Sequence, residues 1–280
     1  MRRRRIADSA ATVWMAGSVA AALIPLAAIL AYVAYKGARL ISWDFLSQPE
    51  PFSFSEPGGG FWNGIKGTLK LLFVASGLSI PVGVLAALYL SELGRGRFAA
   101  LVRFVTDVMT GVPSIFVGIF VYSLVVLETG HFSALSGAVA LAVLMLPVVI
   151  RGSEEVLKLV PGELREAALA LGVPRWRTVL RVVLPSAASG IVTAVMLSVA
   201  RAAGETAPLL FTSFGNRFVT GWTDYSGPDS ALPLLIFRDA RSAYEPAQAR
   251  AWAGALTLIA IVLLFTVVAR TLAARNPFKV

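Results

Sequence analysis

Residues 166–172 of this chain read EAALALG, and residues 182–185 read VVLP. The first stretch has the small residues of a short helix, followed by a glycine at which such a helix can end. It lies in a basic segment between two strongly apolar runs. Because the stretch offers neither a nucleophile nor a pair of acids for catalysis, we interpret it as a surface on which another protein acts.

The composition places the chain among membrane proteins. Its 280 residues are 57% hydrophobic and only 15% charged, which lies outside the range of soluble globular domains. The absence of cysteine excludes disulfides, thiolate metal sites and cysteine nucleophiles. The net charge of +9 could indicate nucleic acid, but the basic residues lie between apolar runs. Membrane topology explains them better, and we predict no nucleic-acid partner.

Apolar runs near the ~20-residue length that crosses a bilayer predict an all-α integral membrane protein with about six transmembrane helices. Backbone groups in lipid must be satisfied internally, so each span should be a helix. Asp107 and Pro147 make the third and fourth spans less regular than the rest. The expected spans are 13–35, 68–90, 104–127, 134–151, 187–211 and 251–272.

The distribution of Lys and Arg predicts the orientation. Most of these residues lie in the segments 1–12, 91–103, 151–186 and 270–280, so both termini are expected on the cytoplasmic side. Arg2 to Arg5 followed by apolar residues is similar to a signal peptide. The apolar run continues to Tyr35, however, which favours an uncleaved first span.

The segment between the fourth and fifth spans is too long for a simple connector. Pro161 can begin a helix and Gly172 can end it, and a second short helix over 175–181 leads to Pro185 at the entry of the fifth span. Two interpretations fit the first helix: docking in a partner's groove, or a position on the bilayer surface with Trp176 at the interface. One apolar face is predicted from the residues that recur at helical spacing, Leu164, Ala167, Ala168 and Leu171.

The order of residues in this segment resembles the signature cytoplasmic loop of ABC importer permeases: Glu-Ala-Ala, three residues, Gly, nine residues, an aliphatic residue, one residue, Leu-Pro. Val182 is the aliphatic residue, where the family usually has Ile. The resemblance implies the type I importer fold and a coupling helix over 163–172 that docks on an ATP-hydrolysing subunit. Glu166, Ala167, Ala168 and Gly172 would form that contact. ATP and Mg²⁺ would be bound by the partner, and this chain would hold no cofactor or metal and have no enzymatic activity.

A charged pair lies inside the fifth expected span. Arg201 and Glu205 are four residues apart, so they can share a helix face and pair. A charge at the bilayer centre costs on the order of 2.5–3.5 kcal/mol on insertion scales, so the pair should face the bundle interior or a wet cavity. Arg201 lies roughly 20 Å along the span at ~1.5 Å per residue. Two roles stay open: a gating ion pair, or a weak site where Arg201 attracts a passing oxyanion.

The sequence of 201–210, Arg-Ala-Ala-Gly-Glu-Thr-Ala-Pro-Leu-Leu, resembles the phosphate-importing members of that family, and the A-type permease of the phosphate-specific transport (Pst) system in particular. Segments 83–92, 111–118 and 146–151 are similar to the same members, and the resemblance covers roughly 60–272. It implies that Arg201, Glu205 and Thr206 belong to the translocation path or its gate, in a bacterial inner membrane. The implied partners are a second related permease (PstC type), two ATPase subunits (PstB type), an extracytoplasmic phosphate-binding protein (PstS type), inorganic phosphate and the lipid bilayer.

The expected organisation has three parts. Residues 1–67 form the first transmembrane helix and an outer loop, 68–272 the permease domain with its cytoplasmic coupling loop at 152–186, and 273–280 a cytoplasmic tail. Two other functions are alternatives. A permease for sulfate or molybdate would carry the same cytoplasmic loop. An integral-membrane enzyme would need a reactive set of side chains that is not evident. A nucleotide-binding loop is also excluded, because Gly59 and Gly64 have its spacing but Ile65 stands where the lysine would be.

Overall fold

The computed structural model describes residues 2–274, and within that range its regular structure is helical apart from an isolated bridge between Phe214 and Asp229. Five helices are long and apolar enough to cross a membrane, and a bent helix pair makes up to six. The prediction of an all-α protein with about six spans is therefore confirmed. The long helices are α1 (Arg2–Gly37), α3 (Trp62–Leu88), α7 (Ala134–Lys158), α10 (Leu184–Ala203) and α13 (Glu245–Ala274). Most of the expected tail, 273–280, lies outside the described residues.

The shorter elements cap and connect these helices. They are α2 (Trp43–Ser47), α4 (Arg97–Gly111), α5 (Ser114–Val121), α6 (Leu127–Thr129), α8 (Gly162–Ala170), α9 (Arg175–Thr178), α11 (Ala207–Thr212) and α12 (Leu232–Ala240). Three π-helical turns continue longer helices: η1 (Tyr89–Leu93) after α3, η2 (Tyr122–Val126) after α5, and η3 (Val179–Val183) between α9 and α10.

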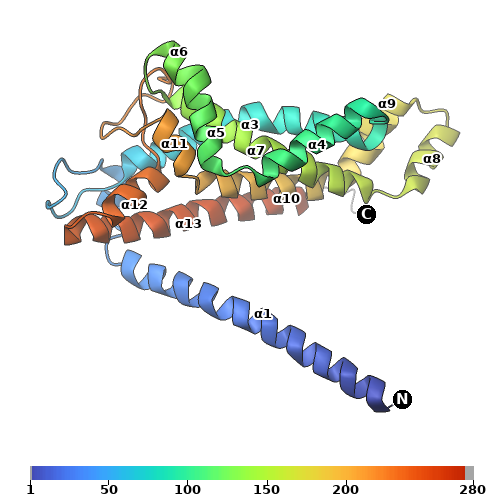
Figure 1. Ribbon diagram of the computed structural model, residues 1–280, viewed down its shortest axis with the longest axis horizontal. Coiled ribbons are helices and arrows are strands. Elements are labelled where there is room, and N and C mark those ends of the chain that lie inside the picture. Colours follow the sequence, from blue (N-terminus) through green and yellow to red (C-terminus); the bar gives the residue numbers. More distant parts are fainter. Residues whose placement is uncertain (1, 275–280) are drawn as a thin grey trace.

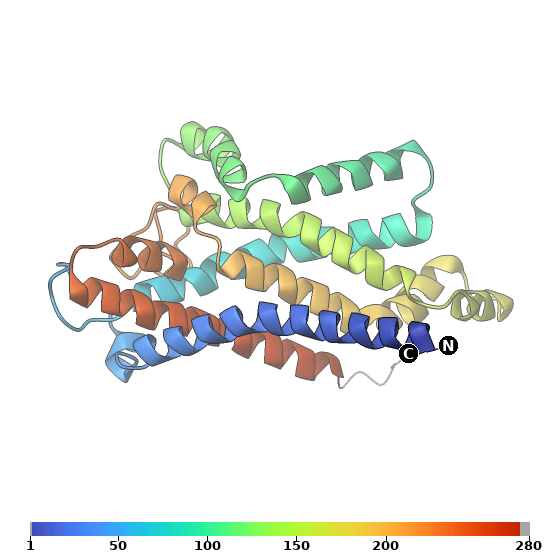
Figure 2. The ribbon, with the colours of Figure 1, turned by 60° about the horizontal axis from the view of Figure 1, so that its bottom comes forward.

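The third expected span, 104–127, is wrong as a single straight helix. The helices 97–111 and 114–129 meet at an angle of 107°, a bend visible in Figure 2. Pro113 causes the break, because proline disfavours the helical conformation in the residue before it. Val112 is extended, with φ −73° and ψ 128°. This segment is therefore a bent pair of helices.

The boundaries of the fifth span also differ from the expectation of 187–211. The short helix expected over 175–181 runs through η3 directly into α10, which gives one helical segment over Arg175–Ala203. Pro185 follows the π-helical turn η3 almost directly, and the helix continues through it. The segment ends at Gly204, and a separate helix, α11, begins after Thr206. The residues 201–206 thus lie at a helix end rather than within a continuous span.

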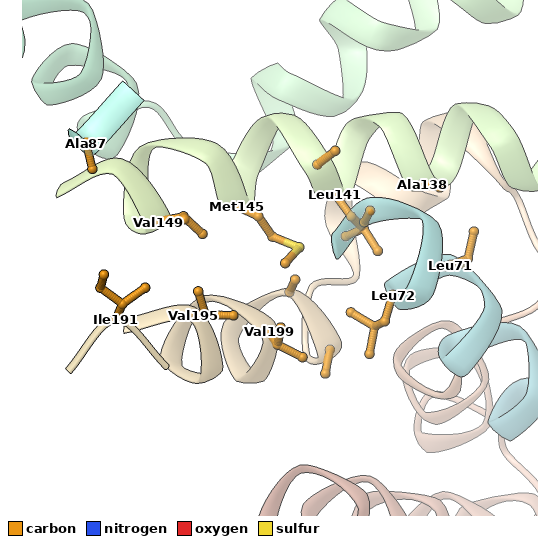
Figure 3. Packing of buried hydrophobic residues seen from close by; sticks show 14 of the residues in the cluster. Leu71, Leu72, Ala87, Ala138, Leu141, Met145, Val149, Ile191, Val195 and Val199 are labelled. Carbon is orange, nitrogen blue, oxygen red and sulfur yellow. The ribbon is translucent and has the colours of Figure 1, made fainter. Parts of the chain in front are cut away.

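The core of the bundle is formed by α3, α7 and α10 (Figure 3). In lipid, helices associate mainly through close van der Waals packing, which favours small residues at their interfaces. Gly152 of α7 packs on Ala194, and Gly190 of α10 packs on Val156, so each helix places a glycine against the other. The labelled core side chains are Leu71, Leu72, Ala87, Ala138, Leu141, Met145, Val149, Ile191, Val195 and Val199.

The first helix, α1, diverges from this bundle (Figure 1). Every residue from Ala10 to Tyr32 is exposed, although the stretch is strongly apolar. Near its end α1 contacts α13: the Tyr32 and Trp252 rings lie edge to face at 5.2 Å, and Gly37 packs closely on Leu256. An apolar helix exposed on all sides must be covered by lipid or by another subunit.

The end of the bundle that carries α12 is closed by a buried ionic network. The Glu50 carboxylate pairs with Arg238, while Asp239 pairs with both Arg238 and Arg250, the latter at 3.4 Å. Burial lowers the pKa of Arg238, but the hydrogen bonds and charges of Glu50 and Asp239 outweigh it and raise the pKa above its usual value. The guanidinium therefore stays charged, and it links the loop at residue 50 to α12.

Candidate functional site

The helix α8 stands beyond the ends of the long helices, at the opposite end from α12 (Figure 1). Pro161 precedes its first residue with φ −57° and ψ 139°, and Gly172 ends it with φ +79°. The Val173 amide donates to the Ala168 carbonyl at 3.1 Å, and the Gly172 amide to that of Leu169 at 2.9 Å. This pair of bonds is the Schellman motif, in which glycine supplies the left-handed residue. The predicted start and stop of this helix are confirmed.

The four residues expected to contact an ATPase do not share one environment. Glu166, Ala167 and Gly172 are exposed, whereas Ala168 is buried, with 8% of its surface accessible. Ala168 therefore anchors α8 to its own chain. The prediction of one apolar face was wrong in part, because of its four residues Ala168 and Leu164 turn inward while Ala167 and Leu171 turn outward.

The exposed surface around α8 carries more large apolar side chains than an ordinary water-exposed surface does. Leu171 has 84% of its surface accessible, and Leu159 and Trp176 are also exposed. Large exposed apolar side chains that gather on a protruding element are typical of protein or membrane contact sites. Glu166 adds a negative charge to this surface.

Arg201 and Glu205 lie where α10 ends. The Arg201 Nε atom is 3.6 Å from Glu205 Oε1, so the pairing expected from their spacing is present. The Arg201 side chain is 49% exposed and the Glu205 side chain 17%. A half-exposed guanidinium on an apolar helix is costly against lipid, so this face fits a wet path or an interface between subunits.

Thr206 stands between α10 and α11 and is half-buried. The chain turns at Gly204, whose amide donates to the Arg201 carbonyl at 3.1 Å, and α11 then begins with Pro208 in its first turn. Helix α11 packs tightly on α5, because Gly118 leaves room for the Pro208 backbone. The structure thus brings Arg201, Glu205 and Thr206 together at one break in the helix, about 25 Å along α10 from Leu184 at ~1.5 Å per residue.

One charged pair that the sequence does not predict lies buried in the bundle. Lys70 of α3 is fully buried, and its Nζ atom lies 2.6 Å from Asp229 Oδ2. It also donates to the Thr220 hydroxyl at 3.2 Å and to the Asp224 carbonyl, and it sits 4.9 Å from the centre of the Tyr225 ring. Its partner is 159 residues away in the sequence, so only the fold reveals the pair.

Replacing Lys70 with methionine is expected to destabilise the protein strongly, because it leaves the buried Asp229 charge unpaired. Breaking a buried pair in this way typically costs about 3–5 kcal/mol. We expect Tm in detergent, followed by tryptophan fluorescence, to fall on the order of 10 °C. Replacing Asp229 with leucine in the same chain should restore much of the loss. A Lys70→Met protein as stable as wild type would contradict the pairing.

A cavity of about 710 Å³ lies beside this lysine, between α3, α10 and α13. Its lining is almost entirely apolar and includes Phe73, Met196, Tyr225 and Phe265, with Lys70 at one side. Such a surface suits acyl chains or apolar side chains and not a hydrated anion. Arg201 and Glu205 are not among its lining residues, so we do not take it as the anion path.

The sequence matches a family and close relatives over most of its length. The family model described as "Binding-protein-dependent transport system inner membrane component" matches residues 79–276. The phosphate transport system permease protein PstA of Yersinia pestis is 46% identical over 220 residues, 78% of this chain and 74% of that protein. PstA 1 of Mycobacterium tuberculosis (strain ATCC 25618 / H37Rv) is 42% identical over 268 residues, 93% of this chain and 85% of that protein.

The fold is also found among solved structures. A chain of the MetNI methionine ABC transporter, in an inward-facing conformation, superposes with a TM-score of 0.59 at 21% identity. The match covers 76% of this chain and 92% of that chain. At this identity the likeness concerns the fold alone, which is that of ABC importer permeases.

Proposed function

Because this chain belongs to the family of binding-protein-dependent transport system inner membrane components, we propose that it is the PstA-type permease subunit of an ATP-driven importer of inorganic phosphate. The observation that carries the phosphate assignment is the 46% identity to a PstA protein over most of both chains. The half-exposed Arg201 at the break of a membrane helix supports an anionic substrate.

We propose that α8 couples this subunit to a separate ATPase. The exposed Glu166, Ala167 and Gly172 would touch the ATPase, while the buried Ala168 would hold α8 against its own chain. Glu166 would pair with a basic group of the partner. ATP and Mg²⁺ would be bound in that partner, since the permease contributes the path and the docking helix.

The assembly would contain two permeases, of PstA and PstC type, two PstB-type ATPase subunits and a PstS-type binding protein that delivers phosphate. Alternating access would follow when the docked helices tilt the two membrane halves about a central path. Arg201, Glu205 and Thr206 would lie on that path or form its gate. A guanidinium already paired with a carboxylate would hold a passing phosphate weakly, as conduction requires.

The orientation is proposed from the distribution of charge. Helix α1 begins, and α13 ends, at the end of the bundle that carries α8 (Figure 1). Because the segments at this end are the basic ones, we assign it to the cytoplasm of a bacterial cell and the α12 end to the outside.

The proposal is tested by ATP-driven uptake of labelled phosphate into liposomes that contain this chain with its neighbouring permease, ATPase and binding protein. We expect uptake that requires this chain and is insensitive to excess sulfate or molybdate. Uptake of sulfate or molybdate in place of phosphate would keep the importer but discard the phosphate assignment. Absence of any ATP-dependent anion uptake by a folded assembly would contradict the transport function. The alternative, an integral-membrane enzyme, would then have to be tested.

A further inference from the structure

One side chain of α8 reaches back into the membrane bundle. The Arg165 Nη2 atom donates to Glu92 Oε1 at 2.7 Å, and Nε lies 3.2 Å from each oxygen of the same carboxylate. Nη2 also donates to the Leu157 carbonyl at 3.0 Å, and Nη1 donates to the Val160 carbonyl at 2.6 Å. Glu92 belongs to η1, the continuation of α3, and Leu157 lies in the last turn of α7. A single guanidinium therefore joins α8 to both α3 and α7.

The chemistry of the site requires arginine. A guanidinium has five N–H donors in a planar fork, so it can bind a carboxylate and two carbonyls at once. The carbonyls at the end of α7 lack full helical partners, and a cation there also interacts favourably with the helix dipole. A lysine could keep the charge, but its single ammonium could not reproduce this arrangement.

The pair is better shielded than an ordinary surface ion pair. The Glu92 side chain is 11% exposed and that of Arg165 is 24% exposed. Exposed pairs are weakened by water and by the entropy of long side chains, whereas a pair held by several hydrogen bonds keeps one geometry. The covalent connections of α8 are the short linkers 159–161 and 171–174, so this cluster is the main polar tie between α8 and the bundle.

From these contacts we infer that Arg165 and Glu92 are positioning residues that transmit displacement of α8 to α3 and α7. We call the two residues the α8 clamp. The inference rests on the proposed function, in which an ATPase moves α8. Because α3 and α7 form the packed core, they move as one unit when α8 is tied to both. Without the clamp, α8 could follow the ATPase while the bundle stays behind.

The test uses the complete importer in liposomes and measures phosphate taken up per ATP hydrolysed. For Arg165→Gln and Glu92→Gln we expect the assembly to co-purify with its ATPase and to hydrolyse ATP, while uptake per ATP falls about tenfold, in the usual range of coupling between sites. The double variant should lose no more than either single variant, because the two residues act as a pair. Arg95→Gln, an exposed arginine in the neighbouring loop, should leave the ratio unchanged.

A second measurement separates coupling from folding. The chain has no cysteine, so Glu92→Cys with Arg165→Cys gives a unique pair that a short bismaleimide can bridge. Bridging should restore uptake per ATP, whereas the single-cysteine variants should not respond. If Arg165→Gln fails to assemble, Arg165→Lys together with the bridged pair provides the same comparison.

Two results would overturn the proposal. An unchanged ratio in Arg165→Gln, or no recovery on bridging, in an importer whose wild type transports phosphate, would reject the clamp alone. A wild-type assembly without ATP-dependent uptake would reject the proposed function and the clamp with it.

Discussion

Phosphate uptake is expected to fall about 10- to 100-fold when Arg201 is replaced by alanine, because a hydrogen bond to a charged group contributes about 1.5–3 kcal/mol. Arg201 is half-exposed at the break between α10 and α11, so its removal creates no cavity in the core. The variant should therefore insert and assemble normally. Uptake of labelled phosphate by the reconstituted importer measures the effect. Arg270→Ala, which removes an exposed arginine from α13, serves as the control.

Two further variants separate the roles that stay open for Arg201. Arg201→Lys keeps the charge but loses the planar fork, so a phosphate contact predicts a clear loss of uptake. Exchanging the pair, Arg201→Glu with Glu205→Arg, keeps two opposite charges at the positions that form the native ion pair. Recovery of transport in the exchange variant would favour a gating bridge over a substrate contact. Normal uptake by Arg201→Ala would contradict both roles.

Much of the fold could be predicted because a membrane helix can be recognised in a sequence by its length and its apolar composition. The errors arose where a backbone detail decided the path. Pro113 was visible in the sequence, yet the apolar run around it suggested one straight span, and the extended Val112 bends it by 107°. At Pro185 the sequence predicted a boundary between a short helix and the fifth span. The structure has one continuous helix there, which passes through the π-helical turn η3.

Only those features of the site that depend on residues close in the sequence could be predicted. The spacing of Arg201 and Glu205 predicts their pairing, and Pro161 and Gly172 predict the ends of α8. The family resemblance implied that Ala168 is part of the docking surface, and helical periodicity could not say which side of α8 its own chain covers. The pairs formed by Lys70 and Arg165 join segments distant in the sequence, and the residues themselves carry no signal for them.

Replacing Glu166 with lysine is expected to uncouple the importer while leaving the permease folded. Glu166 is exposed on α8, and the Schellman motif that ends this helix uses backbone groups only, so the change should cost little stability. At the proposed docking surface it turns an attraction for a basic group into a repulsion, and breaking such a contact typically costs about 2–5 kcal/mol. We expect uptake to fall more than about 30-fold, with reduced co-purification of the ATPase.

The matched control is Glu163→Lys, which makes the same charge change one turn earlier on α8, where Glu163 is also exposed. If Glu166 makes a specific contact, Glu163→Lys should lower uptake only slightly. Its cost should be the few tenths of a kcal/mol that a cation costs near a helix N-terminus. Equal losses would mean that the overall charge of α8, and not a contact of Glu166, governs docking. Normal uptake by Glu166→Lys, in a correctly inserted protein, would reject α8 as the docking helix. Helices α8 and α11 lie toward opposite ends of the bundle (Figure 1), so loss of uptake in both variants would locate coupling and path in different parts of one chain.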